Sequence, residues 1–265
     1  MSFIWLKQTN FIPQMLPDSL ELEAENYIHC IKALRTALDE RLTLAINHPN
    51  DKQKLLLFTG KLKHIDKKKQ TATVHLEEQL DKAVWPTPPQ LQICLCIAAI
   101  QPERLEWAIE KATELGVYRI FIVKAKRSQQ PYFTKIKKNS LRLQKKIASA
   151  CEQSHNVIPP QLEIYADITE IIATNGSEAN LILYMDCKVE KQLQSFTKPS
   201  DYQLTYLFVG PEGGWTGSER ELFDSRHAQI LRLKTPVLRT ETACIAGITA
   251  IIAAKSADSI IYLNP

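Results

Sequence analysis

Residues 207–219 read LFVGPEGGWTGSE, so an apolar run, a cluster of glycines and a helix start follow one another directly. Four of the eight glycines in the chain fall between residues 210 and 217. Glycine adopts positive φ and lets a ligand approach the backbone, so a glycine cluster after a strand favours a small-molecule site. Thr216 and Glu219 have the spacing of a capping box. This stretch predicts a strand, a ligand-binding loop and a helix, in the order expected of an α/β domain.

Residues 231–243, LRLKTPVLRTETA, form a second polar loop between a predicted strand and an alanine-rich helix. Two interpretations of this loop are open. In the first, Thr240 caps the helix, the helix dipole stabilises the Glu241 carboxylate and Arg239 makes a surface ion pair. In the second, the three side chains belong to a ligand-binding or catalytic site. The chain lacks both the Gly-Lys-Ser/Thr of a phosphate-binding P-loop and the Gly-x-Gly-x-x-Gly dinucleotide fingerprint. The ligand is therefore expected to be neither an ordinary triphosphate nor NAD.

Residues 86–265 alternate apolar runs with amphipathic segments, which predicts an α/β domain with a mostly parallel sheet. The predicted strands are Leu91–Ile100, Tyr118–Val123, Leu162–Tyr165, Leu181–Met185, Leu204–Val209 and Ile230–Leu233. One helix is expected from Pro102 to Gly116 and a second from about Lys135 to Cys151, with Ile136, Leu143, Ile147 and Ala150 facing inward. The uncharged run 243–254 predicts a buried helix that is too short to span a bilayer.

Residues 1–85 contain alternating, strand-like runs at 42–46, 55–60 and 71–76, which predict a small β-rich module. Three prolines between residues 86 and 89 restrict φ and remove backbone donors. The sequence therefore predicts a domain boundary at Trp85–Pro89. The first residues lack the pattern of a signal peptide, and the protein is expected in the cytoplasm.

Charge is unevenly distributed along the chain. Nine basic residues and no acidic residue lie between Lys124 and Lys146, a pattern that favours contact with a phosphate backbone. The alternative is a solvated helix face, and Tyr132 and Phe133 beside it either stack on bases or belong to the core. The six cysteines are interpreted mostly as reduced core thiols, with neither zinc nor redox chemistry indicated: Cys30, Cys94, Cys96, Cys151, Cys187 and Cys244.

The two loops together resemble those of the SPOUT class of methyltransferases, most closely the RsmE-type family, which methylates N3 of a uridine in small-subunit (16S) ribosomal RNA. That family pairs Gly-Pro-Glu-Gly-Gly with a later Leu-Arg-Thr-Glu-Thr-Ala, and this chain has them at 210–214 and 238–243. Further similarity covers Lys111–Val117, Arg127-Ser128 and Glu152–Ser154 and, more weakly, His29 with Leu34-Arg35. The resemblance implies a knotted SPOUT α/β domain at 86–265, a PUA-like β-barrel that binds RNA at 1–85, and a homodimer.

The resemblance also implies S-adenosyl-L-methionine as cofactor, no metal, and roles for particular residues. Cofactor contacts are expected at Met185, Val209, Gly210, Pro211, Glu212, Gly213, Gly214, Leu233, Leu238, Thr240 and Thr242. Arg239 is expected to stabilise the negative charge that spreads over the uracil oxygens, and either Glu241 or Glu212 is expected to be the base. RNA contacts are expected at Arg35, Lys124, Lys126, Arg127, Lys137, Lys138, Arg142 and Lys145.

Three positions depart from the family pattern. Lys234 replaces a usual glycine, and Pro236 and Asn156 replace usual arginines. The alternative from another class is a non-catalytic RNA-binding or ribosome-assembly protein that keeps the fold. A third reading, a nucleotide hydrolase, is disfavoured because the P-loop lysine is absent.

Overall fold

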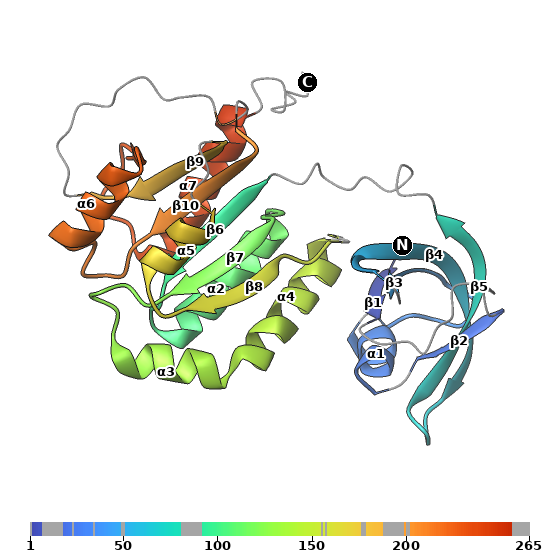
Figure 1. Ribbon diagram of the computed structural model, residues 1–265. Coiled ribbons are helices and arrows are strands. Elements are labelled where there is room, and N and C mark those ends of the chain that lie inside the picture. The colour runs from blue at the N-terminus through green and yellow to red at the C-terminus, as the bar shows by residue number, and fades with distance from the viewer. Residues whose placement is uncertain are drawn as a thin grey trace. The chain divides into compact units, whose positions relative to one another are not determined.

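The computed structural model describes residues 2–6, 18–22, 24–33, 35–48, 51–80, 92–154, 156, 158–175, 179–187, 199 and 202–255. The chain divides into two units, residues 1–88 with 151–158 and residues 89–150 with 159–265, and each is described by itself (Figure 1). The expected boundary at Trp85–Pro89 lies outside the described residues. Within the described ranges, no helix is long and apolar enough to cross a membrane.

The N-terminal unit is built on a five-stranded sheet with strand order β1-β3-β4-β5-β2. Its elements are β1 (Ser2–Leu6), β2 (Ser19–Leu22), α1 (Ala24–Tyr27), a π-helix (Ile28–Ala33), β3 (Arg41–His48), β4 (Asp51–Asp66) and β5 (Thr71–Leu80). β1 pairs with β3 in parallel, and the other neighbours are antiparallel. Leu22, Tyr27, Phe58 and Val74 belong to its buried core. This confirms the expected β-rich module, whereas its likeness to a PUA barrel stays a prediction.

The second unit contains a six-stranded sheet in which every pair of neighbouring strands is parallel. Its order is β11-β9-β10-β6-β7-β8. The strands are β6 (Ile93–Ala98), β7 (Arg119–Val123), β8 (Gln161–Tyr165), β9 (Asn180–Met185), β10 (Leu204–Val209) and β11 (Gln229–Leu231). All six lie where the sequence predicts strands, and the α/β prediction is confirmed.

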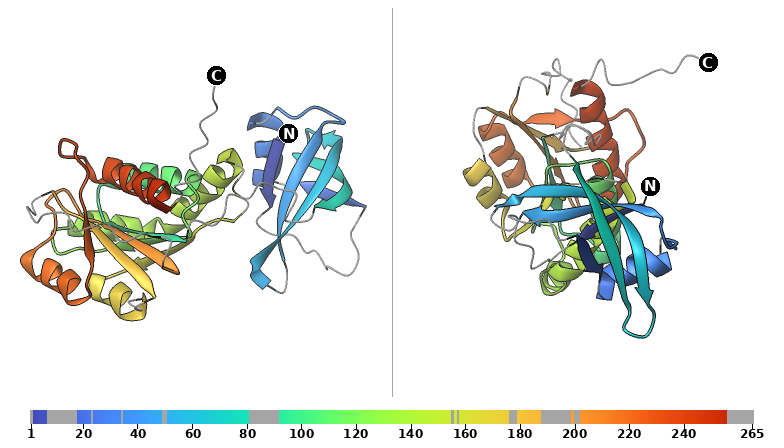
Figure 2. Two further views of the ribbon diagram at one scale, coloured as in Figure 1. Left: turned by 90° about the horizontal axis from the view of Figure 1, so that it is seen from above. Right: turned by 90° about the vertical axis from the view of Figure 1, so that its right-hand side faces the viewer.

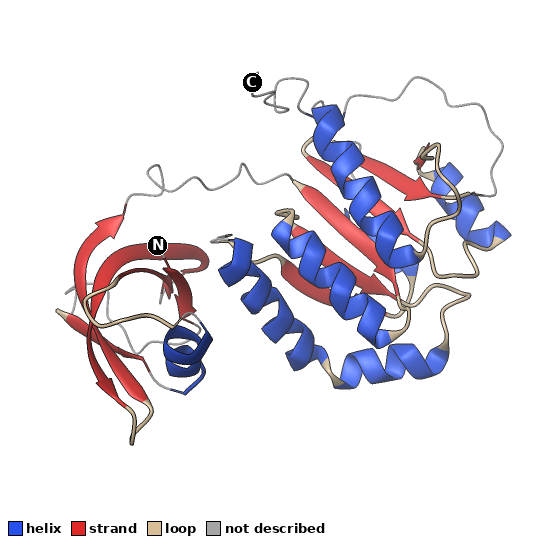
Figure 3. Cartoon of the chain, turned by 180° about the vertical axis from the view of Figure 1, so that it is seen from behind, coloured by secondary structure: helices blue, strands red, loops and turns tan. Residues whose placement is uncertain are grey.

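Helices cover both faces of this sheet, as Figure 2 shows from above. They are α2 (Pro102–Glu114), α3 (Gln130–Lys138), α4 (Ser140–Ser154), α5 (Ile168–Asn175), α6 (Gly217–Ser225) and α7 (Thr240–Lys255). On one face, Phe121, Tyr184 and Phe208 share a buried core with Ile171 of α5 and Phe223 of α6. On the other face, α2 and α7 pack against each other (Figure 3). The central strands are thus buried on both sides, which explains why β6 and β10 are almost entirely apolar.

Helix α7 lies unusually close to the sheet. A Cβ atom at Gly247 would be 2.8 Å from Leu207 Cδ2 and 2.9 Å from Met185 Sδ, closer than side-chain carbons normally approach. Glycine at this position therefore permits the helix to pack directly over the ends of β9 and β10, beside the loops that follow them.

The prediction of a single helix from Lys135 to Cys151 is wrong, because two helices, α3 and α4, meet at Asn139. Asn139 has φ −106° and ψ 23°, outside the helical region. Its N–H closes α3 on the carbonyls of Lys135 and Ile136, while its own carbonyl accepts the first bonds of α4 from Arg142 and Leu143. The inward positions are nevertheless correct, since Ile136, Leu143, Ile147 and Ala150 are all buried.

Candidate functional site

Strand register brings three loops to one edge of the parallel sheet. Val209 at the end of β10 is paired with Met185 at the end of β9, and Leu231 at the end of β11 is also paired with Met185. The segments that follow, beginning at Asp186, Gly210 and Arg232, therefore leave the sheet side by side. This is the carboxyl edge, where open α/β sheets place their ligands.

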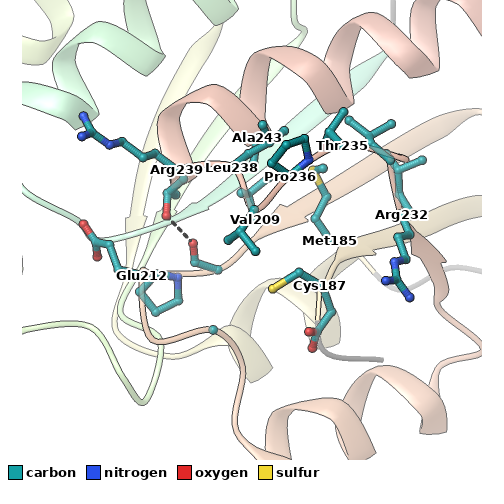
Figure 4. Close-up of a pocket in the computed structure, with 18 residues that line it drawn as sticks. Met185, Cys187, Val209, Glu212, Arg232, Thr235, Pro236, Leu238, Arg239 and Ala243 are labelled. Carbon is teal, nitrogen blue, oxygen red and sulfur yellow. Dashed lines mark hydrogen bonds between the residues drawn. The ribbon is translucent and has the colours of Figure 1, made fainter. Parts of the chain in front are cut away.

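A pocket of about 400 Å³ lies between these three loops and the start of α7 (Figure 4). That volume is in the range of sites for small molecules and cofactors. The pocket is lined by Met185, Asp186, Cys187, Val209, Gly210, Pro211, Glu212, Gly214, Leu231, Arg232, Leu233, Thr235, Pro236, Val237, Leu238, Arg239, Thr240 and Ala243. The lining combines apolar side chains with loop backbone, an arrangement suited to a ligand with an apolar body and a few polar groups.

One hydrogen bond joins the two loops that the sequence singles out. The Thr240 hydroxyl donates to the carbonyl oxygen of Gly210 at 2.9 Å, and the threonine is 5% exposed (Figure 4). Thr240 is the first residue of α7, and the sequence interpretation of its side chain as a helix cap is replaced by this contact across the pocket. Glu241 does lie in the first turn of α7, where a carboxylate favours the helix dipole.

The backbone of the glycine loop requires glycine at two positions. Gly214 has φ +68°, a conformation that other residues rarely adopt. A Cβ atom at Gly210 would be 3.1 Å from the Trp215 ring, so the indole packs directly against this position. The Trp215 ring N–H donates to the carbonyl of Met185 at 3.1 Å, and the tryptophan is fully buried. Trp215 therefore fastens the glycine loop to the end of β9.

Arg127 and Glu219 hold the other side of the same loop. The Arg127 guanidinium donates to the carbonyls of Gly213 at 2.7 Å and Trp215 at 3.1 Å. Glu219, which is 2% exposed, accepts from the backbone N–H groups of Lys126 at 2.8 Å and Thr216 at 2.7 Å. The capping box predicted for Thr216 and Glu219 is confirmed. Arg127 is thus engaged with the main chain of the loop, and its expected contact with RNA stays a prediction.

The loop after β9 is fixed from α6. The Arg220 guanidinium donates to the carboxylate of Asp186 at 2.7 Å, and the Asp186 side chain is only 3% exposed. This hydrogen bond raises the pKa of Arg220. A charged pair that is hydrogen-bonded and nearly buried holds its geometry better than an exposed pair. The loops after β9 and β10 thus each have a dedicated anchor.

Most of the expected cofactor residues line the pocket: Met185, Val209, Gly210, Pro211, Glu212, Gly214, Leu233, Leu238 and Thr240. Arg239 lines it as well, whereas Gly213, Glu241 and Thr242 do not. The pocket is also lined by residues of the 231–243 segment to which the sequence assigned no individual cofactor contact: Leu231, Arg232, Thr235, Val237 and Ala243. Sequence reasoning missed Cys187, an exposed cysteine that follows the third loop's aspartate.

Arg104 is the most informative residue that sequence reasoning missed. It lies in the first turn of α2, and its guanidinium is 3.6 Å from a carboxylate oxygen of Glu212 and 3.8 Å from one of Glu241. The Glu212 side chain is 46% exposed and the Glu241 side chain 13%. The second carboxylate oxygen of Glu241 is buried without a hydrogen-bond partner among the described residues. Both candidate bases therefore share one cation.

The basic stretch is partly neutralised by an acidic row on α2. Lys135 pairs with Glu103 at 3.2 Å, Arg142 with Glu106 at 2.7 Å and Lys146 with Glu110 at 2.8 Å. Three of the nine cations therefore pair with carboxylates of α2, an arrangement that neither the RNA interpretation nor the solvated helix face had specified. Phe133 is buried in this packing, so the stacking role considered for it is wrong.

The remaining cations of the stretch differ among themselves. Lys126 pairs with Asp167 at 3.1 Å, and Lys137 lies 5.6 Å from the centre of the Phe133 ring. Lys137, Lys138 and Lys145 are all exposed. Arg35, in the N-terminal unit, is exposed and has φ +54°.

The three departures from the family pattern lie in different settings. Lys234 is exposed and does not line the pocket, although its neighbours Leu233 and Thr235 do. Pro236 lines the pocket. Asn156 is buried and structural, because its N–H donates to the Cys151 carbonyl and its side-chain oxygen accepts from the N–H of Ile158.

Five cysteines, Cys30, Cys94, Cys96, Cys151 and Cys244, are buried, in line with core thiols. Burial raises the pKa of the Cys151 thiol to about 12. Among the residues with described positions, no group of three or more His, Cys, Asp or Glu side chains is arranged to hold a metal ion.

Comparison with known proteins gives a consistent result. Residues 87–252 match the RNA methyltransferase domain family. The ribosomal RNA small subunit methyltransferase E of Rickettsia conorii is 30% identical over 238 residues, which are 88% of this chain and 88% of that protein. The protein of the same name from Bacillus subtilis is 29% identical over 171 residues, covering 61% of this chain and 66% of that protein.

A solved structure is similar over nearly the whole chain. The crystal structure of a ribosomal RNA small subunit methyltransferase E from Neisseria gonorrhoeae, bound to S-adenosyl methionine, superimposes with a TM-score of 0.75 at 26% identity. The match covers 95% of this chain and 96% of that chain.

Proposed function

The chain belongs to the RNA methyltransferase family, and we propose that it uses S-adenosylmethionine to methylate N3 of a uridine in small-subunit (16S) ribosomal RNA. The single observation that carries this proposal is the pocket at the carboxyl edge of the sheet, where the glycine loop and the Leu238–Ala243 segment are joined by the Thr240–Gly210 hydrogen bond. A relative 26% identical over nearly the whole chain is described as bound to S-adenosyl methionine.

The lining residues fit this cofactor in size and chemistry. The pocket volume of about 400 Å³ suits a nucleoside-sized ligand. Apolar side chains such as Val209, Leu233 and Leu238 would contact its base and ribose, and the backbone of Gly210 and Gly214 permits close approach. When bound, S-adenosylmethionine supplies a methyl group from its sulfonium, and this displacement requires no metal. The protein's task is then to align the acceptor and to manage its proton.

Arg239 and Glu212 are the groups we assign to that task. Both line the pocket, and Figure 4 shows them on the same side of it. As the proton leaves uracil N3, negative charge spreads over the ring oxygens, and the permanently charged Arg239 guanidinium stabilises it there. Of the two candidate bases, Glu212 lines the pocket and Glu241 does not, so we assign proton acceptance to Glu212 and a supporting role to Glu241.

For the RNA contacts we retain Lys137 and Lys138, which are exposed on α3, where phosphate groups can reach them. Lys145, an exposed residue of α4, is retained with them. The partly exposed Lys124 and the exposed Arg35 complete the proposed RNA contacts. The trefoil knot, the PUA-like character of the N-terminal unit and the homodimer follow from family membership and are proposed with it.

The decisive experiment is incubation of the protein with labelled S-adenosylmethionine and small ribosomal subunits, followed by mapping of the modified base. We expect label on N3 of one uridine. Label on another base or on a ribose would keep the methyltransferase assignment and overturn the target. Binding of RNA without binding of S-adenosylmethionine would favour the alternative, a non-catalytic RNA-binding protein.

Replacing Arg239 separates chemistry from cofactor binding. We expect Arg239→Ala to lower the rate of transfer by about 10²–10³-fold, the usual effect of removing a group that stabilises developing charge. The dissociation constant for S-adenosylmethionine, measured by calorimetry, should stay close to that of the unmodified protein. Arg226→Ala, which removes an exposed arginine directly after α6 and outside the pocket lining, is the matched control and should leave both quantities unchanged. Loss of cofactor binding in Arg239→Ala would contradict the role assigned to it.

A further inference from the structure

Arg104 brings together three segments that are far apart in the sequence. Its guanidinium reaches Glu212 in the glycine loop and Glu241 in the first turn of α7 from its place on α2. The Arg104 side chain is 35% exposed, so the cation sits at the surface beside the pocket rather than inside it. Arg104 does not line the pocket.

Arg239 is the other arginine of this region, and it is differently placed. Its side chain lines the pocket and is exposed. Among the residues that the structure describes, its guanidinium has no ion-pair or hydrogen-bond partner, although Glu241 is only two residues away along the chain. Glu212 lies on the same side of the pocket (Figure 4).

The charges explain why this difference matters. A guanidinium pairs readily with a carboxylate, and its planar fork matches two carboxylate oxygens. With Arg104 in place, its guanidinium pairs with both carboxylates, and Arg239 pairs with neither. Without Arg104, both carboxylates would lose this partner, and their attraction for Arg239 would be unopposed. A cation held by protein carboxylates is less available to an anionic substrate, because those partners must first be displaced.

We infer that Arg104 is a positioning residue, which keeps Glu212 and Glu241 paired so that the guanidinium of Arg239 stays available to the RNA substrate. This inference rests on the proposed function. It assigns to α2 a role in substrate recognition, although α2 contributes no lining residue to the pocket. Arg104 acts through Arg239 and is itself not in contact with the reacting atoms.

The first test is RNA binding. Labelled 16S ribosomal RNA is titrated with Arg104→Ala, Arg239→Ala and the double variant at fixed salt concentration. We expect Arg104→Ala to weaken RNA binding by about ten-fold, the loss expected if Arg239 no longer makes one charge-assisted hydrogen bond to the RNA. In the Arg239→Ala background, Arg104→Ala should have no further effect, because the residue through which it acts is gone. S-adenosylmethionine binding should change little.

The matched control is Lys111→Ala. Lys111 lies on the same helix, is similarly exposed and also contacts two carboxylates, Glu110 at 2.9 Å and Glu114 at 2.7 Å. This substitution removes one positive charge from α2, as Arg104→Ala does, but at a position that does not contact Glu212 or Glu241. An equal loss of RNA affinity in Lys111→Ala, or additive losses for Arg104 and Arg239, would overturn the inference, since either result means that Arg104 acts as general surface charge or contacts RNA itself.

A second test needs no RNA and so distinguishes failure of this inference from failure of the proposed function. The side-chain Nε–Hε signal of Arg239 is followed by NMR. In Arg104→Ala we expect slowed guanidinium rotation and a shifted signal, as Arg239 pairs with the freed carboxylates, and Glu212→Gln in that background should partly reverse the change. An unaltered Arg239 signal would refute the inference. Absence of RNA binding by the unmodified protein, with the expected NMR change present, would refute the proposed function alone.

Discussion

Replacing Thr240 by valine removes one hydroxyl while nearly conserving the shape of the side chain. That hydroxyl donates to the Gly210 carbonyl at 2.9 Å and is the direct link between the glycine loop and the start of α7. Loss of a neutral hydrogen bond costs about 0.5–1.5 kcal/mol of stability. Because Gly210 is partly exposed and lines the pocket, water can reach its carbonyl after the donor is lost, and we expect a cost of about 1 kcal/mol, within that range.

Two measurements check this value. Without cofactor, the midpoint of thermal unfolding should fall by about 2–4 °C, the usual effect of 1 kcal/mol in a protein of this size. Because the link holds two sides of the pocket together, the dissociation constant for S-adenosylmethionine should also rise, by up to about five-fold if the whole energy is expressed in binding.

Thr240→Ser is the control, since it retains the hydroxyl and removes only a methyl group. Serine should preserve most of the cofactor affinity, whereas valine should not. If Thr240→Val unfolds at the same temperature and binds S-adenosylmethionine as tightly as Thr240→Ser, the hydrogen bond does not organise the pocket and the reasoning fails.

Two further changes test an anchor of the glycine loop and an ion pair between α2 and α4. Arg127→Ala should weaken S-adenosylmethionine binding more than RNA binding, because it removes the donors to the Gly213 and Trp215 carbonyls. Titrations with both ligands check this, and a selective loss of RNA binding would show that Arg127 contacts RNA. The free energy of unfolding should decrease as the pH is lowered, because hydrogen bonds from Lys146 and Lys111 lower the pKa of Glu110 from its ordinary 4.5. That contribution is present above pH 4.5 and is lost as the pH drops through the lower folded-state pKa, so Glu110→Gln should flatten the dependence of the thermal midpoint between about pH 6 and pH 3.

The features that the sequence predicts best are those set by neighbouring residues. The capping box of Thr216 and Glu219 and the strand ending at Val209 depend on local backbone chemistry, and both are present. Parallel strands do the rest, because they bring loops that follow them to one edge. The pocket could therefore be anticipated from two loops alone. Its exact membership could not, since Leu231 and Ala243 enter it only through the register of β11 and the direction of α7.

The features that the sequence did not reveal are contacts between distant charges. Arg127 was counted with the RNA-binding residues because charge was summed along the chain, yet it bonds to Gly213, 86 residues away. Arg104 has no local feature that points to Glu212. Both contacts depend on which helix covers which end of the sheet, and hydrophobic periodicity does not specify this.

The sequence does contain a pattern that predicts which cations of the basic stretch pair with α2. Glu103, Glu106 and Glu110 follow one another at helical spacings of three and four, so they form an acidic row along α2. Their partners in α3 and α4 are also spaced to share a face, and two complementary rows on neighbouring helices predict packing between them. Charge therefore indicates a nucleic-acid surface only after cations facing such a row have been set aside, and here that selection leaves Lys137 and Lys138 as the positions where substitution should most reduce RNA affinity.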